Sequence, residues 1–238
     1  MKLVQSFLEE SAAQMPDKTA LVCGDQRLTY AQIEAMANRL AQALQANGVQ
    51  RGDRVLLFLQ NSVELVVGIF ATLKANAVFV PVNHSTKADK LRFMAQDCRA
   101  AGLITWQRQA KTAVTLQESV PSLKTIVVVG DAPEGCFSFA EIQETFSAER
   151  LCCQSIDQDL ACLIYTSGST GEPKGVMSAH NNVLFAASSI ITYLQNRPDD
   201  IVLNVLPLSF DYGLYQLLMT FKFGGTLVLE RSFAYRRK

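Results

Sequence analysis

Apolar residues follow two alternating spacings along the chain, one typical of helices and one typical of buried strands. Between residues 31 and 47 they recur every three or four positions, and Gly48 follows where a left-handed cap belongs, which predicts an amphipathic helix. The next segment, 54–60, is short and almost wholly apolar, as expected for a strand covered on both faces. The alternation then continues with helices 63–75, 87–98 and 108–116 and with strands 77–82, 103–105 and 125–129. Because each parallel connection needs a crossover helix, this order predicts an α/β fold with mostly parallel, doubly wound sheets and flanking helices.

A long connection over residues 130–158 interrupts the alternation and contains only one short helical pattern, so a subdomain seam could lie there. The elements expected after it are strands 160–166, 175–179, 201–206 and 226–230, a helix that Asn181 caps and that runs to about Gln195, and a helix over 212–223. We expect the last strand to lie at an uncovered sheet edge, where its apolar side chains would favour self-association.

Composition excludes several classes of protein. The 238 residues suit one large domain or two small ones, at about 100 to 200 residues per domain. Because 49% of them are hydrophobic and only 18% charged, global disorder is excluded. The 22 basic residues balance the 22 acidic ones, so no net charge would attract nucleic acid.

Cysteine usage and the N-terminus indicate a cytoplasmic protein. The six cysteines show no C-x-x-C spacing and have only two histidines to join them, so no metal site is expected and the thiols should stay reduced. Glu9 and Glu10 interrupt the start of the chain before a secretory signal could form. The most apolar stretch, 63–73, is well short of the ~20 residues of a membrane span, so no membrane span is expected.

One ten-residue loop concentrates groups that bind anions. It reads Thr166, Ser167, Gly168, Ser169, Thr170, Gly171, Glu172, Pro173, Lys174 and Gly175. Glycines let successive backbone N–H groups converge on an anion, hydroxyls add donors, and a lysine adds a full positive charge. This combination favours phosphate oxygens, and the alternative is an ordinary flexible turn.

The loop does not fit the P-loop pattern G-x-x-x-x-G-K-[ST]. Pro173 stands where that pattern needs a glycine, and Gly175 follows the lysine in place of a serine or threonine. The residues after Lys174 favour a strand rather than a helix, so the loop is predicted to join two strands as a hairpin.

The segment Tyr165 to Val176 resembles the signature of the AMP-forming adenylating enzymes, the superfamily of acyl-CoA synthetases, luciferases and peptide-synthetase adenylation domains. Further segments resemble the same family in its usual order: 28–33, 73–83, His180 with Asn182, and Phe210 with Asp211. The chain departs from the family at Asn76, where a glycine is usual, and at His84, where a proline is common.

The family's later motifs have no counterpart in these residues, so the chain resembles about the first half of such an enzyme. The resemblance implies a partial AMP-binding N-terminal domain over residues 1–238, with the C-terminal domain absent.

The resemblance also implies a reaction and its participants. The family activates a carboxylic acid with ATP and Mg²⁺ to an acyl adenylate, and then transfers the acyl group to the thiol of CoA or of a carrier protein. It places the phosphates among Thr166, Ser167, Gly168, Ser169, Thr170, Gly171 and Lys174, and assigns catalytic roles to Thr166, Lys174 and His180. Phe210 and Asp211 would contact the acid substrate.

Several alternatives stay open. His180 is either an imidazole near the phosphates or the acyl pocket, as the resemblance implies, or a residue of the helix entry beside Asn181. Asp211 would pair with the ammonium group of an amino acid, whereas a fatty acid offers it no cation. We expect the aromatic residues Phe185, Tyr193, Phe210 and Tyr215 to belong to the core rather than to an acyl pocket. Beside the acid–thiol ligase, the chain could be an amino-acid-activating domain, a phosphate-binding module without turnover, or a structural remnant.

Overall fold

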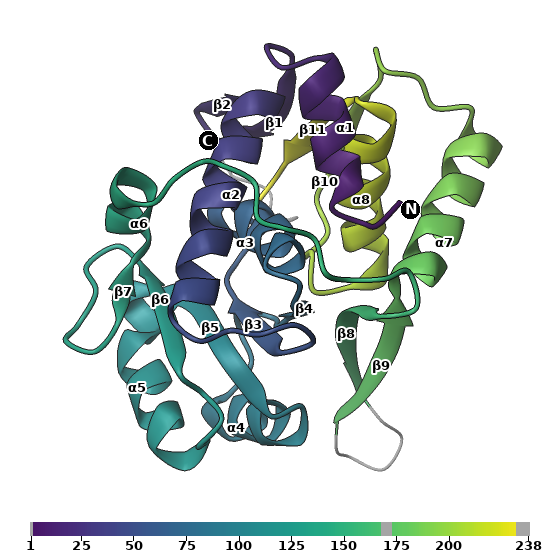
Figure 1. Cartoon of the computed structure of the whole chain (residues 1–238). Helices are drawn as coiled ribbons and strands as arrows, with labels where there is room; N and C mark the ends of the chain where they lie inside the picture. Colours follow the sequence, from purple (N-terminus) through teal and green to yellow (C-terminus); the bar gives the residue numbers. More distant parts are fainter. Residues whose placement is uncertain (1, 168–172, 232–238) are drawn as a thin grey trace, which may run out of the picture.

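Two β-sheets and the helices around them form the structure (Figure 1). It is a computed structural model that describes residues 2–167 and 173–231. The seven-stranded sheet has the order β7 (Phe137–Ser138), β6 (Thr125–Val129), β5 (Ala100–Trp106), β3 (Arg54–Phe58), β4 (Val78–Pro81), β8 (Leu160–Ser167), β9 (Pro173–Ala179). The four-stranded sheet has the order β10 (Ile201–Asn204), β11 (Thr226–Leu229), β1 (Thr19–Cys23), β2 (Gln26–Thr29).

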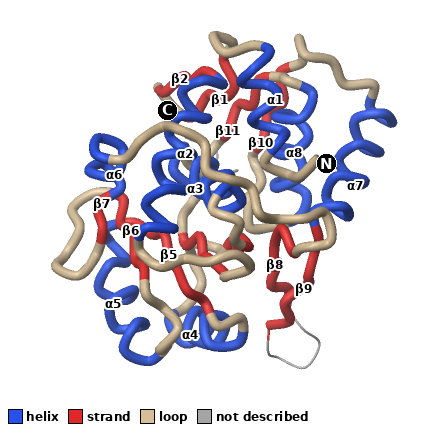
Figure 2. The backbone as a smooth tube through the Cα atoms, in the orientation of Figure 1, coloured by secondary structure: helices blue, strands red, loops and turns tan. Residues whose placement is uncertain are grey.

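Most neighbouring strands run parallel, as the alternating sequence pattern predicted. In the seven-stranded sheet only β8 and β9 pair antiparallel, and in the four-stranded sheet only β1 and β2 do. The helices are α1 (Ser6–Gln14), α2 (Tyr30–Ala46), α3 (Val63–Lys74), α4 (Ala88–Asp97), α5 (Ala110–Ser119), α6 (Phe139–Thr145), α7 (His180–Leu194) and α8 (Asp211–Phe223), with a short 3₁₀ turn at Gln107–Gln109. Figure 2 shows how these helices surround the strands. The predicted α/β class is therefore confirmed.

Strand β3 shows how the seven-stranded sheet is covered on both faces. Val55 and Leu57 pack into one core cluster with residues of α2 and α3. Leu56 and Phe58 pack into a second cluster with residues of α4 and α5. Because successive side chains of a strand point to opposite faces, an all-apolar strand needs helices on both sides, and this sheet has them.

Helices α2 and α3 lie between the two sheets. Ile33 of α2 and Phe70 of α3 share one core cluster with Leu57 of β3 and with Leu227 of β11, which belong to different sheets. Helix α3 is apolar on nearly every side and is buried along its length, as its sequence predicted. The two sheets and the helix pair therefore share one continuous core.

Capping side chains mark the first turn of several helices. Thr29 and Gln32 form a reciprocal capping box at the start of α2, and Ser62 accepts the N–H of Leu65 at the start of α3. Helix α7 differs from the prediction that Asn181 caps it. The carboxamide of Asn182 accepts the N–H of Ala179 at 3.2 Å instead, because α7 begins at His180 and its N-cap is Ala179, two residues before the predicted cap.

The expectation of an uncovered edge at strand 226–230 was wrong. β11 lies inside its sheet, between β10 and β1, because the N-terminal strand β1 pairs with it in parallel. The end of the strand order falls on β10, whose Ile201 and Leu203 side chains are exposed. The residue patterns did not predict the hairpin of β1 and β2, and it is β1 of this hairpin that pairs with the edge of β11.

The long connection over residues 130–158 does not divide the seven-stranded sheet, since β8, which follows it, pairs with β4, which precedes it. The side chain of Asn76 forms hydrogen bonds with the last part of this connection. Asn76 adopts φ = 62°, a left-handed conformation that asparagine tolerates better than most residues. Its side-chain oxygen accepts the N–H groups of Gln154 and Ser155, and its amide donates to the carbonyl of Cys152. Its side-chain oxygen also accepts the hydroxyl of Ser155, so the asparagine meets the backbone requirement of a glycine and adds four hydrogen bonds.

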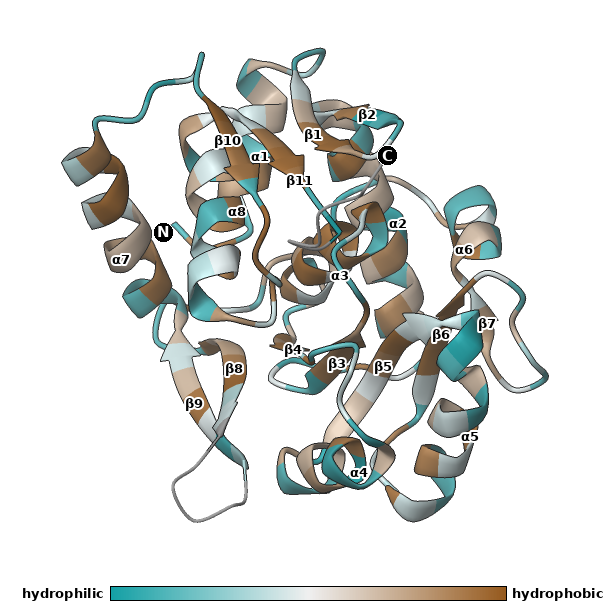
Figure 3. Cartoon of the chain, turned by 180° about the vertical axis from the view of Figure 1, so that it is seen from behind, coloured by the Kyte–Doolittle hydropathy of each residue, from teal (hydrophilic) through white to brown (hydrophobic). Residues whose placement is uncertain are grey.

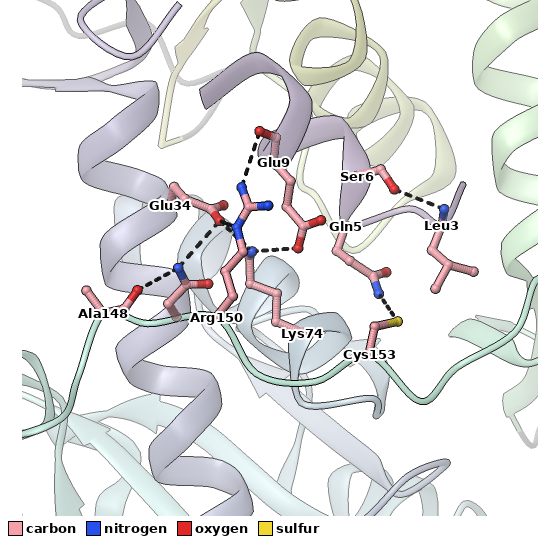
Figure 4. A network of polar contacts seen from close by, with 10 residues as sticks. Leu3, Gln5, Ser6, Glu9, Glu34, Lys74, Ala148, Arg150 and Cys153 are labelled. Atoms are coloured by element: carbon pink, nitrogen blue, oxygen red, sulfur yellow. Dashed lines mark hydrogen bonds and ion pairs between the residues drawn. The ribbon is translucent and has the colours of Figure 1, made fainter. Parts of the chain in front are cut away.

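A buried lysine joins three helices and the same connection (Figure 4). The Lys74 ammonium, whose side chain is 4% exposed, lies 2.8 Å from carboxylate oxygens of both Glu9 and Glu34. Arg150 donates to the same Glu34 oxygen at 2.9 Å. Helices α1, α2 and α3 and the segment before β8 are therefore linked by one charge cluster.

Replacing Lys74 by methionine should lower the free energy of unfolding by about 3 kcal/mol, because it leaves two partly buried carboxylates short of a cation. The matched control is Lys2→Met, which breaks the exposed Lys2–Glu10 pair and should cost less than about 0.5 kcal/mol. Urea unfolding followed by circular dichroism measures both. Equal losses in the two variants would contradict this role of Lys74.

Candidate functional site

The phosphate-type loop is carried by an antiparallel hairpin. Strand β8 enters the loop and β9 leaves it, with the register running from Leu160 opposite Ala179 to Ser167 opposite Pro173. The prediction that the loop joins two strands is confirmed, because the strand β9 follows it, whereas a helix follows a P-loop. Gly168, Ser169, Thr170 and Gly171, which the sequence predicted as phosphate donors, lie outside the described residues, as does Glu172.

The hairpin places two predicted site residues opposite each other. Thr166 and Lys174 are register partners at the loop end of the ladder. Side chains directly opposite in an antiparallel pair share a face, with their Cβ atoms about 4.5–5.5 Å apart. Lys174 is exposed, so its ammonium is available to a ligand beside the Thr166 hydroxyl.

A cavity of about 720 Å³ opens beside the hairpin. Its walls come from three segments that are distant in sequence: the hairpin with Thr166 and Pro173, the start of α8 with Phe210 and Asp211, and the connection from β4 into α4. Three of the residues predicted to bind the nucleotide or the acid, Thr166, Phe210 and Asp211, therefore share one cavity. The remaining lining residues are Pro81, Val82, Asn83, Ser85, Thr86, Lys87, Lys90, Met94, Ile164, Tyr165 and Ser209.

Tyr165 fixes the hairpin against α4. Its hydroxyl donates to the carboxylate of Asp97 and lies 3.5 Å from the carbonyl oxygen of Met94. Its ring covers Gly175 on the neighbouring strand, where an added Cβ would lie 3.3 Å from the ring. Burial, together with the hydrogen bond to Asp97, raises the pKa of Tyr165 above its usual range, so the residue stays a neutral donor.

His180 lies at a different place. It is 1% exposed at the first position of α7, and its Nδ1 accepts the backbone N–H of Val4 at 3.2 Å. It is not among the described residues that line the cavity beside the hairpin. Burial lowers the pKa of His180 to about 4, so the imidazole is neutral at physiological pH. This geometry supports the helix-entry interpretation rather than a contact with phosphate.

A second, largely apolar groove of about 560 Å³ lies between α7 and α8. Tyr193 and Tyr215 line it, and so does Asp211, which thus borders both hollows. Four aromatic residues, Phe185, Tyr193, Phe210 and Tyr215, were expected to belong to the core, and this was wrong for three of them. The side chains of Phe185, Tyr193 and Phe210 are 75%, 86% and 56% exposed. Figure 3 shows the apolar residues gathered along α7.

Three residues that line the cavity were not predicted from the sequence: Lys87, Lys90 and Ser209. Lys87 and Lys90 open the helix that follows β4, and β4 lies beside β8 in the sheet. In open α/β sheets, ligands bind beyond the carboxyl ends of the strands. A lysine pair just after a predicted buried strand was therefore an available signal. Ser209 offered none, because a single serine before Phe210 is unremarkable in sequence.

Neither a metal-binding cluster nor a membrane-spanning helix occurs among the described residues. Across residues 2–167 and 173–231, no group of three or more histidine, cysteine, aspartate or glutamate side chains is arranged to hold a metal ion. Within the same ranges, no helix combines the length and apolar character that crossing a membrane requires.

The sequence pattern of one protein family, described as AMP-binding enzyme, matches residues 8–238. The chain belongs to the AMP-binding enzyme family. Within it the chain is 32% identical over 228 residues to bacitracin synthase 1 of Bacillus licheniformis, a match that covers 96% of the chain. It is also 34% identical over 197 residues to a medium/long-chain fatty-acid–CoA ligase of Mycobacterium tuberculosis, covering 79% of the chain. Both peptide synthases and acyl-CoA ligases of the family are therefore similar to it.

Solved structures of family members share the fold. The anthranilate CoA ligase AuaEII in complex with anthranoyl-AMP matches with a TM-score of 0.92 and 30% identity over 98% of the chain. The N-terminal domain of FACL13 from Mycobacterium tuberculosis matches with a TM-score of 0.89 and 30% identity over 98% of the chain.

The family members are longer than this chain. It spans 46% of the anthranilate CoA ligase and 58% of the FACL13 domain, 36% of the fatty-acid–CoA ligase and 4% of bacitracin synthase 1. The matched part corresponds to an N-terminal portion of the adenylate-forming enzymes.

The buried His180 should make stability pH-dependent. The folded protein keeps this imidazole neutral down to about pH 4, whereas the unfolded chain takes up a proton below about pH 6.5. The unfolded state thus binds more protons between these values, and the free energy of unfolding should fall by up to about 3 kcal/mol as the pH drops through this window. Urea unfolding at several pH values should show a flatter slope for His180→Gln than for the wild type. Identical slopes would contradict this assignment.

Proposed function

We propose that this chain supplies the phosphate-binding part of an enzyme that activates a carboxylic acid with ATP. The acid becomes an acyl adenylate, and the acyl group then passes to a thiol of CoA or of a carrier protein. The observation that carries the proposal is the hairpin. It pairs Thr166 with the exposed Lys174, and Thr166 lines a cavity together with Phe210 and Asp211.

The chemistry assigns a specific task to the hairpin. A carboxylate oxygen attacks the α-phosphorus of ATP, the bond from that phosphorus to the bridging oxygen breaks, and pyrophosphate leaves with the bonding electrons. Negative charge grows on the leaving group, so donors fixed beside it stabilise the transition state more than the ground state. The Thr166 hydroxyl and the Lys174 ammonium would supply such donors, and Ser167, Gly168, Ser169, Thr170 and Gly171 of the loop would complete them.

The nucleotide would enter with Mg²⁺ as its counter-ion. In this proposal the ion belongs to the substrate and neutralises phosphate oxygens that the loop does not reach. Thr166 and Lys174 carry a hydroxyl and an ammonium rather than carboxylates, a set that suits phosphate oxygens and leaves the metal to be held by the nucleotide.

The position of Asp211 bears on the class of acid. Its carboxylate borders both the cavity beside the hairpin and the apolar groove between α7 and α8. An amino acid would offer it an ammonium partner, and the similarity to bacitracin synthase 1 favours this alternative. The apolar groove and the fatty-acid–CoA ligase relative favour a fatty or aryl acid.

His180 has a structural role in this proposal. Its Nδ1 holds the backbone of Val4 against the start of α7, and α7 directly follows the hairpin. The third alternative, a phosphate-binding module without turnover, would use the same hairpin and differ only in the absence of exchange activity.

Exchange of labelled pyrophosphate into ATP, measured over a panel of fatty, aryl and amino acids on the protein as its gene encodes it, tests the function. Lys174→Ala should slow exchange by roughly ten- to a hundred-fold, because a charge-assisted hydrogen bond contributes about 1.5–3 kcal/mol. Lys174→Arg should recover part of the rate, and Lys111→Ala on α5 should leave it unchanged. An unchanged rate in Lys174→Ala would refute the phosphate role.

The exposed aromatic face of α7 should make the 238-residue chain self-associate. Phe185 and Tyr193 are 75% and 86% exposed, and large apolar patches favour contact with other surfaces. Sedimentation velocity should show mass that rises with concentration, and the double variant Phe185→Ser with Tyr193→Ser should reduce this rise. A wild-type monomer at every concentration would count against it.

A further inference from the structure

Two lysines lie in the wall of the cavity beside the hairpin. Lys87 and Lys90 line it together with Thr166 and Pro173 of the phosphate-type loop. Neither lysine belongs to the family-like motifs in the sequence. Their position in this cavity comes from the way α4 is docked.

Helix α4 turns one face toward the hairpin. Lys90 and Met94 are four residues apart and Asp97 follows three later, a spacing that puts side chains on the same side of a helix. The far end of this face contacts Tyr165, whose hydroxyl bonds to Asp97 and approaches the Met94 carbonyl. With that end fixed on β8, the near end carries Lys90 and Lys87 to the cavity wall.

The electrostatics of this wall are positive. Among the described residues neither Lys87 nor Lys90 forms an ion pair, whereas Asp89 of the same helix pairs with Arg92 at 2.7 Å. The amino end of α4 adds the positive end of a helix dipole. Asp211 is the one acidic side chain among the described residues that line the cavity.

An unused hydroxyl borders the same cavity. Ser209 lines it, and the Ser209 Oγ is buried with no hydrogen-bond partner among the described residues. Buried polar atoms are nearly always satisfied in folded proteins, so an unpaired hydroxyl in the wall of the cavity that both lysines line calls for an acceptor. A phosphate oxygen meets that need.

We propose that Lys87 and Lys90 form a second phosphate-binding element of this cavity, facing the hairpin. The inference rests on the proposed function, because the ligand is one that the reaction supplies. Two substrates carry the required chemistry: the triphosphate of the nucleotide, and the phosphates of a phosphopantetheine-bearing thiol acceptor. Each would place a phosphate between the lysines and the hairpin.

The test compares the double variant Lys87→Gln with Lys90→Gln against wild type and against Lys111→Gln on α5. Isothermal titration calorimetry measures the Kd of each probe. The nucleotide arm uses ATP and inorganic tripolyphosphate. The acceptor arm uses CoA and 4′-phosphopantetheine, with pantetheine as the probe that lacks phosphate.

We expect the double variant to raise the Kd of the phosphate-bearing probes in one arm by about ten-fold or more, since two charge-assisted contacts are lost. The affected arm identifies the substrate. Pantetheine binding and the Lys111→Gln protein should be unchanged. Raising the salt from about 0.05 M to about 0.5 M should weaken the same probes, because screening reduces the attraction of exposed charges. The variant Lys87→Arg with Lys90→Arg, which keeps both charges, should bind as wild type does.

Three results would overturn the inference: wild type binding no phosphate-bearing probe, the double variant binding both arms as wild type does, or the arginine variant losing affinity as the glutamine variant does. These outcomes are separate from failure of the proposed function. If Lys174→Ala abolishes pyrophosphate exchange while the glutamine variant binds every probe normally, only this inference fails. If no acid supports exchange while the glutamine variant loses phosphate affinity, only the proposed function fails.

Discussion

The pairing of β8 with β4 is the constraint on which the candidate site depends. Phe79 lies opposite Cys162 in this parallel pair, and the strands meet beside β3 in the middle of the sheet order. Because β4 and β8 run in the same direction, the segments that follow them leave the sheet at the same edge. The loop after β8 and the amino end of α4 after β4 are therefore neighbours, although they are about eighty residues apart in the sequence.

The last part of the connection before β8, residues 147–156, has no buried apolar residue and is held mainly by polar side chains. Asn38 donates to the carbonyl of Ala148, Arg150 reaches the buried Glu34, and Asn76 binds the backbone around Ser155. A segment with few buried apolar residues needs such anchors to follow a single path, because unsatisfied backbone groups would be costly away from water. The charge cluster around Lys74 thus contributes to the site indirectly, by fixing the path into the strand that carries the loop.

Much of the fold could be predicted from residue patterns, for physical reasons that also set the limits. Strands buried on both faces, such as β3, have an unbroken apolar sequence that few other structures share. β2 lacks that signal because its residues are exposed or half-buried, and the short apolar run of β1 was not recognised as a strand beside it, so the partner of β11 was missed. For the site, the glycine and hydroxyl pattern identified the hairpin loop, but the exposure of Phe185 and Tyr193 could not be predicted, because an apolar helix face is the same in sequence whether or not a neighbour covers it.

The contact between Tyr165 and α4 also sets the rotational phase of that helix. Its far end is fixed at Asp97 by one hydroxyl, two turns away from Lys90. Each residue of an α-helix advances the azimuth by about 100°, so deleting one residue between these positions would swing the lysines around the axis and out of the cavity wall. The sheet beneath would keep its strand order. Insertions or deletions in this short helix would therefore change the number of positive charges in the cavity wall without changing the order of the strands in the sheet.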